Sequence, residues 1–482
     1  MTGEAGEAAV LGIDLGTTEV KAGLVTLDGR LLGLARAGYR TDTDPEVARA
    51  EQDPEAWWGA ITTIVRTLVA ETGAAVVAIG LDGHGPSLVA VDDAGRPTRP
   101  AIIWSDGRAA AEQAELAEAT GLQGWALAGL PAALWIERHE PAVAAATRWY
   151  LATWEFLAFR LCGVAATTLV PGQPYPSNEV LDAAGLDSRR IPPPVVAGDV
   201  VGELTDNAAE QLGLRSGTPV VAGVVDAWAS YHGAGMTAAG DALDPGGAGG
   251  GFGVYWDRPL VVPGSFSTIA PLSDLYSVGG AMAATGRALD WFRDGILGDA
   301  IPTAALLEEA ATTPPGAAGV LFLPYLAGER SPLWDPTARG AFVGLSLAHG
   351  RGHLVRAIVE ASALAIRHVA EPILAAGARV REMRVCGGPA RSEMWNQVKA
   401  DVTGFPVAIP SVLETAVVGA AILGASGIGA YGDVRAAIQG MTRVSRRLEP
   451  RSELRDLYDG AYDAYTKLHP AIGPIVRGMA RP

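Results

Sequence analysis

A short segment near the amino terminus carries side chains suited to binding phosphate. Asp14 ends the apolar run AVLGIDLG and is followed by Gly16, Thr17 and Thr18. Gly16 permits a tight turn whose backbone N–H groups point outward, and the threonine hydroxyls add further donors. Lys21 follows closely enough to contact the same phosphates as a point charge. The segment therefore predicts a phosphate-binding turn, with an ordinary β-hairpin turn as the alternative.

Asp14 also indicates a metal ion. A carboxylate at the end of a buried strand is costly unless an opposite charge compensates it. Hydrated Mg²⁺ would supply that charge, because magnesium prefers a carboxylate, substrate phosphates and water as ligands. We therefore expect Asp14 to hold Mg²⁺ through water.

A second carboxylate in a similar position is a candidate catalytic base. The apolar run TPVVAGVV leads directly into Asp226, and site residues of α/β proteins commonly lie where a strand emerges from the sheet. This carboxylate can accept a proton from a sugar hydroxyl that attacks a γ-phosphate. The alternative, compatible with that role, is that Asp226 caps the helix that follows. Asp82, in the run AAVVAIGLDG, is the next candidate for the base.

These residues need a scaffold of alternating strands and helices. Residues 9–40 predict three short strands joined by glycine-containing turns. Residues 53–72 predict a helix that starts at an Asp-Pro pair, and residues 74–83 predict a buried strand. The alternation makes the chain up to about residue 235 an α/β domain.

The same pattern restarts after Gly235. The segment DALDPGGAGGGFGVYWDRPL again predicts strand, glycine turn and strand, and residues 353–377 predict a helix with one apolar stripe that ends at Gly377. We therefore expect a weak internal duplication of two α/β halves, with a boundary near residues 235–245.

Composition and charge exclude several classes of function. The 482 residues include 37 basic and 53 acidic side chains, a formal net charge of −16, whereas a nucleic-acid-binding protein needs a basic face. No apolar run approaches the ~20 residues that span a membrane, and the amino terminus lacks the features of a signal peptide. The two distant cysteines fit a reducing compartment. We expect a cytoplasmic protein that binds neither nucleic acid nor a membrane.

Lysine is rare in this chain, so each lysine is informative. The chain contains Lys21, Lys399 and Lys467, and its other basic residues are arginines. No lysine follows a glycine, which excludes the P-loop motif GxxxxGK[ST], and the protein-kinase triplets HRD and DFG are absent.

Several sequence blocks, taken in order, resemble the FGGY family of carbohydrate kinases. The block GIDLGTTEVKAGLVTLDG is similar to the family's first phosphate motif, and GLDGHGPSLVAVD and PAIIWSDGRA are similar to its sugar-site segments. The block GTPVVAGVVDAWASYHGAG carries Asp226 where the family has its catalytic aspartate. LFLPYLAGERSPLWDPTARGAFVGLSLAHGRGHLVRAIVEA fits the family signature, and CGGPARSEMWNQVKADVTGFPV and ETAVVGAAILGA resemble its adenosine-binding elements. The resemblance covers residues 9–465.

This resemblance implies a fold of two domains, each of which binds a different ligand. The family belongs to the actin-like ATPase superfamily, an α/β fold of two ribonuclease-H-like domains that close a central cleft over nucleotide and sugar. We therefore expect an N-terminal sugar-binding domain, residues 1–238, and a C-terminal nucleotide-binding domain, residues 239–482. A homodimer is a further hypothesis.

The resemblance also implies which residues bind each ligand. Asp226 is expected to be catalytic and to contact the sugar. The other expected sugar contacts are His84, Gly85, Trp104 and Asp106, with Arg108 in the same segment. ATP is expected to contact Asp14, Gly16, Thr17, Thr18, Lys21, Gly247, Ala248, Gly249, Gly387, Gly388, Ala390, Arg391 and Asn396.

Three departures from the family pattern concern activity and substrate. The second phosphate turn is commonly Gly-Thr-Ser, whereas Gly247-Ala248-Gly249-Gly250 lacks both hydroxyls; backbone amides can still bind phosphate without them. Xylulose kinases usually have Gln-Met-His-Gly where this chain has His84-Gly85-Pro86-Ser87, so His84 takes the glutamine position. The stretch AATTLVPGQPYPSNEV lacks the family's Thr-Asp-x-Ser run.

The expected reaction is in-line transfer of the γ-phosphate of ATP, with Mg²⁺, to a terminal hydroxyl of a sugar. The expected acceptor is a ketose such as xylulose or ribulose, or a polyol. Asp226 would deprotonate the hydroxyl while Thr17, Thr18 and Lys21 neutralise phosphate oxygens. Two alternatives stay open: an actin-like scaffold or chaperone-type ATPase, and a catalytically weak sugar-sensing pseudokinase.

Overall fold

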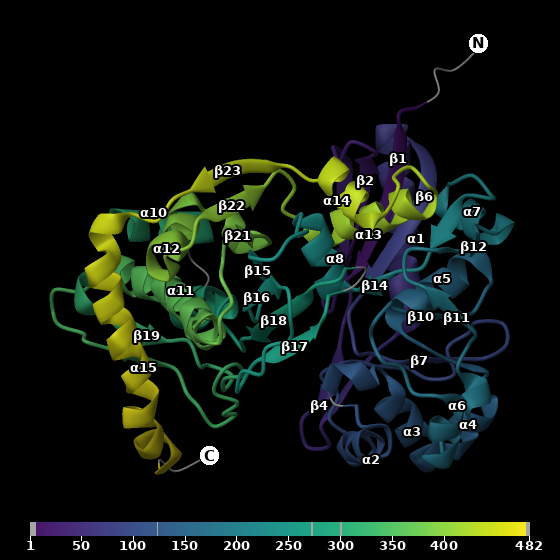
Figure 1. Cartoon of the computed structure of the whole chain (residues 1–482), viewed down its shortest axis with the longest axis horizontal. Coiled ribbons are helices and arrows are strands. Elements are labelled where there is room, and N and C mark those ends of the chain that lie inside the picture. The colour runs from purple at the N-terminus through teal and green to yellow at the C-terminus, as the bar shows by residue number, and fades with distance from the viewer. Residues whose placement is uncertain (1–5, 123, 271–272, 299–300, 479–482) are drawn as a thin grey trace. The chain divides into compact units, whose positions relative to one another are not determined.

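The computed structural model describes residues 6–122, 124–270, 273–298 and 301–478 (Figure 1). The chain forms two compact units. The first comprises the chain up to Gly235 together with Glu414–Thr442, and the second comprises Met236–Leu413 and the chain from Arg443 onward. The sequence had placed 414–442 with the second domain, and its packing explains the difference. Among the described helices, none is long and apolar enough to cross a membrane.

The first unit is built on a sheet with the strand order β12-β13-β6-β1-β2-β3, in which β14 also pairs with β6. Strands β1, β2 and β3 form an antiparallel meander, and β6 lies parallel to β1. This arrangement confirms the strands predicted for residues 9–40 and 74–83. The strands are β1 (Ala8–Leu15), β2 (Glu19–Thr26), β3 (Leu31–Gly38), β6 (Ala75–Gly83), β12 (Val200–Glu203), β13 (Pro219–Val221) and β14 (Val224–Val225).

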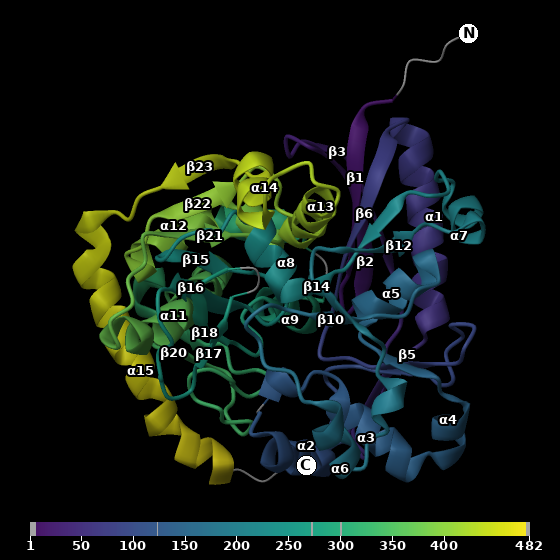
Figure 2. The same ribbon diagram turned by 45° about the vertical axis from the view of Figure 1, so that its right-hand side comes forward.

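Helix α1 (Pro54–Thr72) packs against this sheet along β2 and β3 and can be followed beside the strands in Figure 2. As predicted, Asp53 caps it: the carboxylate accepts a hydrogen bond from the Glu55 N–H at 2.9 Å. Gly73 ends it in the left-handed conformation (φ 62°). Its apolar face joins alternate residues of β1 in one buried core that includes Leu11, Ile13, Leu15, Trp57, Ile61, Val65 and Leu68.

Helix α13 (Thr415–Gly427) covers the opposite face of the same sheet because two glycines let it approach closely. A Cβ atom at Gly12 would lie 2.2 Å from the Val417 carbonyl oxygen, and one at Gly80 would lie 1.8 Å from that of Ala420. Only a residue without a side chain fits there. The return of 414–442 to the first unit follows from this fit, which pairs positions far apart in the sequence.

The second unit is built on a sheet with the strand order β17-β18-β16-β15-β21-β22-β23. Here β15 and β16 are antiparallel, and β21 lies parallel to β15. The first unit places β1, β2 and β6 in the same way, so the predicted repeat of strand, glycine turn and strand is confirmed. The strands are β15 (Asp241–Asp244), β16 (Gly251–Trp256), β17 (Phe266–Ile269), β18 (Tyr276–Ala281), β21 (Glu382–Val385), β22 (Val407–Pro410) and β23 (Val444–Leu448).

Two helices position the predicted nucleotide-binding residues of this unit. Helix α11 (Arg351–Ala375) confirms the helix predicted for 353–377, with Gly377 just beyond it at φ 106°. It packs against α12 (Glu393–Thr403), which follows the Gly387-Gly388 turn.

The remaining elements flank or connect these sheets. In the first unit they are β4 (Asp42–Asp44), β5 (Arg49–Gln52), β7 (Val89–Val91), β8 (Ala101–Ile102), β9 (Trp149–Leu151), β10 (Thr167–Leu169), β11 (Pro194–Val196), α2 (Ala110–Thr120), α3 (Leu130–His139), α4 (Pro141–Ala146), α5 (Thr153–Cys162), α6 (Asn178–Ala183), α7 (Asp206–Leu212), α8 (Asp226–Gly233) and α14 (Val434–Met441). In the second they are α9 (Arg287–Trp291), α10 (Thr303–Thr312), β19 (Leu321–Leu323), β20 (Ala341–Val343) and α15 (Arg455–Gly478).

The contact between Gly80 and α13 makes a testable prediction. Gly80→Ala should lower the free energy of unfolding by about 3 kcal/mol, because the new methyl group has no space against the Ala420 carbonyl. Gly59→Ala is the matched control, since Gly59 is exposed on α1 and its Cβ would meet nothing within 4 Å. The control should gain up to about 1 kcal/mol from helix propensity. Urea unfolding measures both, and equal stabilities would contradict the proposed packing.

Candidate active site

Three aspartates lie at the carboxyl ends of neighbouring parallel strands in the first unit. Asp14 in β1 pairs in register with Asp82 in β6, and Val224 in β14 pairs with Asp82 just before the chain reaches Asp226. Residues in register on parallel strands project from the same face of a sheet. The sheet therefore brings together the predicted metal ligand, the predicted base and the reserve candidate for the base, on the face that α13 covers.

Asp82 occupies the centre of this group and is fully buried. In the described residues its carboxylate meets no hydrogen-bond donor, and its polar neighbour is the Asp14 carboxylate. Burial and the charges of Asp14 and Asp226 raise the pKa of Asp82 well above its usual range. The protonated form of Asp82 is therefore favoured over its carboxylate.

Lys21 balances part of this charge. It faces Asp14 across the β1–β2 pair, with its Nζ 3.2 Å from Asp14 Oδ2 and 3.7 Å from Glu19 Oε1. Burial alone would lower the pKa of Lys21, but the carboxylates of Asp14, Glu19 and Asp82 outweigh it and raise that pKa. Lys21 is thus a fixed cation beside the predicted phosphate-binding turn.

Asp226 begins helix α8 and is only partly exposed. Its Oδ1 accepts a hydrogen bond from the Ala227 N–H at 2.7 Å. Burial and the Asp14 charge raise the pKa of Asp226 to about 7, against the opposing effects of that hydrogen bond and of Lys21. A carboxyl with this pKa is well matched to proton transfer at neutral pH.

The carbonyl oxygens of the turn after β1 accept hydrogen bonds from side chains elsewhere in the first unit. The Gly16 carbonyl accepts from the Tyr39 hydroxyl, and the Thr17 carbonyl accepts from Gln52 Nε2 at 2.7 Å. The Thr17 hydroxyl accepts from Trp104 Nε1 at 2.9 Å. Trp104, a predicted sugar contact, therefore lies directly beside the predicted phosphate turn.

His84 is linked to Trp104 through Ser87 and is 1% exposed. Its Nδ1 is 2.8 Å from Ser87 Oγ, which also accepts from the Trp104 backbone N–H at 3.0 Å. Burial lowers the pKa of His84 to about 3, so the ring is neutral. Its Nε2 is buried and has no hydrogen-bond partner in the described part of the chain. The adjoining Gly85 is backed by Val225 and Trp154 side chains, which a Cβ atom would approach to 3.3 and 3.4 Å.

Asp106 supports the loop that carries Trp104. Its carboxylate accepts from the Ala50 N–H at 2.7 Å and from the backbone and guanidinium of Arg108 at 2.8–3.0 Å. Arg108 also pairs with Glu51. These bonds satisfy Asp106 internally, and its direct contact with a sugar stays a prediction.

Helix α5 is hydrogen-bonded to the His84 segment. Thr153 Oγ1 donates to the His84 carbonyl at 2.9 Å, and Glu155 accepts from the N–H groups of Ala152 at 2.8 Å and Thr168 at 2.6 Å. Burial raises the pKa of Glu155 to about 7 in spite of these two hydrogen bonds.

In the second unit, the predicted phosphate turn and the predicted adenosine segment touch each other. Gly246 and Gly247 have φ values of 62° and 73°, and a Cβ atom at Gly246 would lie 2.3 Å from the Cys386 carbonyl oxygen. Gly387, at φ 70°, lies against the Gly247 amide. Successive backbone N–H groups in a turn can form a concave surface that suits an anion.

The predicted adenosine contacts differ in exposure. Gly388 and Arg391 are exposed, whereas Ala390 and Asn396 are buried. Asn396 Nδ2 donates to the Ala390 carbonyl at 2.7 Å, so this amide holds the 388–391 turn in place. Its direct contact with a nucleotide stays a prediction.

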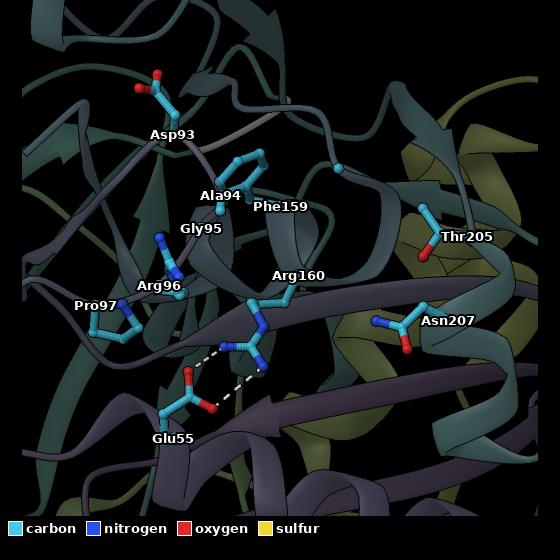
Figure 3. A pocket seen from close by; sticks show the side chains of 11 residues that line it. Glu55, Asp93, Ala94, Gly95, Arg96, Pro97, Phe159, Arg160, Thr205 and Asn207 are labelled. Atoms are coloured by element: carbon cyan, nitrogen blue, oxygen red, sulfur yellow. Dashed lines mark hydrogen bonds and ion pairs between the residues drawn. The ribbon is translucent and has the colours of Figure 1, made fainter.

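A cavity of ≈ 680 Å³ opens on the first unit between α1, α5, α7 and the loop at 93–97 (Figure 3). Figure 3 shows the Glu55 carboxylate paired with the Arg160 guanidinium inside it. None of the predicted site residues lines this cavity, so we do not assign the active site to it.

The chain matches models of both domains of one family. Residues 9–171 match the N-terminal domain of the FGGY family of carbohydrate kinases, and residues 247–428 match the C-terminal domain. The xylulose kinase of Escherichia coli is 32% identical, with 82% of this chain and 84% of the relative covered. The gluconokinase of Bacillus subtilis is 28% identical over 86% of each. The crystal structure of a xylulose kinase from Rhodospirillum rubrum is 30% identical, covers 97% of this chain and 100% of its own, and superposes with a TM-score of 0.81.

Glu155 makes the stability of the first unit depend on pH. Its folded-state pKa of about 7 lies above that of an unfolded glutamate, so its contribution to stability is fully present in acid and is lost as the pH rises through about 7. Relative to Glu155→Gln, the wild type should lose about 2–3 kcal/mol of unfolding free energy between pH 5 and pH 8. Urea unfolding at several pH values measures the difference, and parallel pH profiles would refute it.

Proposed function

Because the chain belongs to the FGGY family of carbohydrate kinases and uses ATP to phosphorylate a sugar, we propose that its acceptor is a neutral ketose. Xylulose is the first candidate and ribulose the next, with phosphate transferred to a terminal hydroxyl. The xylulose kinases among the relatives support xylulose as the acceptor. The observation that carries the choice is the charge around the three strand-end aspartates.

The charged groups near these aspartates favour a neutral sugar over a sugar acid. Lys21 is paired with Asp14, Arg108 is paired with Asp106 and Glu51, and His84 is neutral. A gluconate carboxylate would therefore meet the negative charge of Asp226 without a free cation from these groups. Gluconate, suggested by the gluconokinases among the relatives, is the competing candidate.

Asp226 is the proposed general base. At neutral pH a substantial fraction of its carboxyl groups is ionised, and each can accept the hydroxyl proton as the sugar oxygen attacks. The new bond joins that oxygen to the γ-phosphorus while the bond to ADP breaks. Lys21 and the hydroxyls of Thr17 and Thr18 are proposed to neutralise phosphate oxygens. Trp104 and the unpartnered Nε2 of His84 are proposed to contact the sugar.

The same group of residues fits a divalent cation. The carboxyl groups of Asp14 and Asp226 lie at the ends of neighbouring strands, and Lys21 is the cation paired with Asp14. We propose that Asp14 holds hydrated Mg²⁺, which would supply charge neutralisation for the phosphates.

In the second unit, the proposed nucleotide site is the pair of glycine segments that touch at Gly246 and Gly387. The turn at 246–250 has left-handed glycines at 246, 247 and 250, although Ala248 lacks the hydroxyl that the expected family pattern has there. Thr285 secures this turn, since its Oγ1 donates to the Gly249 carbonyl at 2.7 Å. The backbone amides of the turn are proposed to bind a phosphate without the missing side chains.

A coupled ADP-release assay over a panel of sugars tests the substrate. Xylulose and ribulose should support turnover well above gluconate and glycerol, and a preference for gluconate would refute the proposal. Turnover without sugar would indicate the scaffold-type ATPase, and sugar binding without turnover would indicate a pseudokinase; the comparisons do not favour either. A cytoplasmic location and a homodimer stay predictions.

Asp226→Asn tests the base. Asparagine has nearly the shape of aspartate but cannot accept the proton, so kcat should fall by ~10²–10⁴. The Kd for ADP should stay within about threefold, because Asp226 is assigned to the sugar hydroxyl. A variant that retains near-wild-type kcat would exclude Asp226 as the base, and Asp82→Asn would then be measured.

The pKa of Asp226 also predicts a pH profile. The ionised carboxylate is the active form, so kcat/KM of the wild type should rise with pH and level off above about pH 7. Steady-state kinetics from pH 5 to 9 measures this. A flat profile across that range would contradict the assignment.

A further inference from the structure

A buried ion pair lies beneath the glycine turn of the second unit. Lys399, on α12, is 2% exposed, and its Nζ is 2.5 Å from Oδ2 of Asp244, which is 3% exposed. A lysine is almost never fully buried unless it is paired. The pair therefore has a cost in desolvation that a surface lysine would avoid.

Asp244 connects the buried ammonium to the turn. It is the last residue of β15, and its Oδ1 accepts from the Gly246 N–H at 2.9 Å while its Oδ2 faces Lys399. One carboxylate thus bridges the lysine and the first amide of the turn. The approach of Gly246 to the Cys386 carbonyl leaves the turn little freedom to adopt another conformation.

A small cavity lies at the same place. Its volume is ≈ 20 Å³, and its lining includes Lys399, Asp244, Gly246, Gly247 and Trp395. This space is about the size of one water molecule. Lys399, Asp244 and the glycines of the turn therefore border the same small cavity.

The first unit shows a related arrangement. Asp14 ends β1 and pairs with Lys21, and Asp244 ends β15, the strand that corresponds to β1 in the second unit. Two of the three lysines in the chain thus pair with the aspartates that precede the two predicted phosphate turns. An ammonium is a compact charge, whereas the planar guanidinium of the far commoner arginine needs more space.

We propose that Lys399 is a positioning residue for nucleotide binding: it fixes Asp244, which fixes the Gly246 amide and thereby the phosphate-binding shape of the turn. The proposal rests on the assignment of the second unit to the nucleotide. Lys399 does not touch the nucleotide itself, because its ammonium is buried against Asp244.

Lys399→Met in the full-length chain tests this role. Without the cation the carboxylate is free to leave Gly246, so the Kd for ADP, measured by calorimetry, should rise about tenfold or more. The KM for ATP should rise in parallel. Sugar affinity without nucleotide should stay within about twofold, since the sugar residues lie in the first unit. Lys467→Met is the control, because Lys467 is an exposed lysine on α15.

A second variant separates positioning from stability. Lys399→Met alone leaves a buried carboxylate unpaired and should lower Tm. Lys399→Met with Asp244→Leu removes both charges together with the acceptor of the Gly246 N–H, and should recover most of the Tm. Positioning requires that ADP binding stays weak in this double variant although Tm recovers. If ADP affinity recovers together with Tm, or if Lys399→Met binds ADP like the wild type, Lys399 is purely structural and the proposal is overturned. A wild type that binds no ADP would instead refute the nucleotide site itself.

Discussion

The chemistry proposed for this protein depends on carboxylates placed at the ends of buried parallel strands. Such a position costs free energy, because the charge loses water without a full set of partners. The two units meet the cost differently. In the second unit, Asp244 is matched by one lysine and one amide, so the group is neutral and serves the backbone. In the first unit, Asp14, Asp82 and Asp226 share a single lysine. This crowding favours the protonated form of Asp82, and it supports the proposals that the site binds a cation and that Asp226 accepts a proton.

The parts of the fold that local patterns encode could be predicted from the sequence. The meander of β1, β2 and β3, the Asp53 cap of α1 and the end of α11 at Gly377 each depend on neighbours within a few residues. The pairing of Asp14 with Lys21 was not predicted, although it too depends on close neighbours. A tight turn between two antiparallel strands places residues at that spacing opposite each other.

The remainder depends on contacts between distant positions. Nothing near residue 414 in the sequence shows that α13 will pack against Gly12 and Gly80. The sequence made Asp82 the second candidate for the base, because it is an acidic residue in an apolar run. Its place between two other carboxylates depends on the register of β1, β6 and β14. Asp106 was expected to contact the sugar. In the folded loop its carboxylate accepts hydrogen bonds from Ala50 and Arg108, and the sequence does not show these contacts.

The return of residues 414–442 to the first unit has a consequence for biosynthesis. The ribosome makes the chain in order, and Gly235 emerges long before Thr442. At about 5–20 residues per second, the first sheet waits roughly 10–40 s for the helix that covers its glycine-rich face. During this interval Gly12 and Gly80 lie on an uncovered apolar surface. We therefore expect a nascent chain stalled before residue 414 to expose an apolar surface that is available to chaperones and to aggregation.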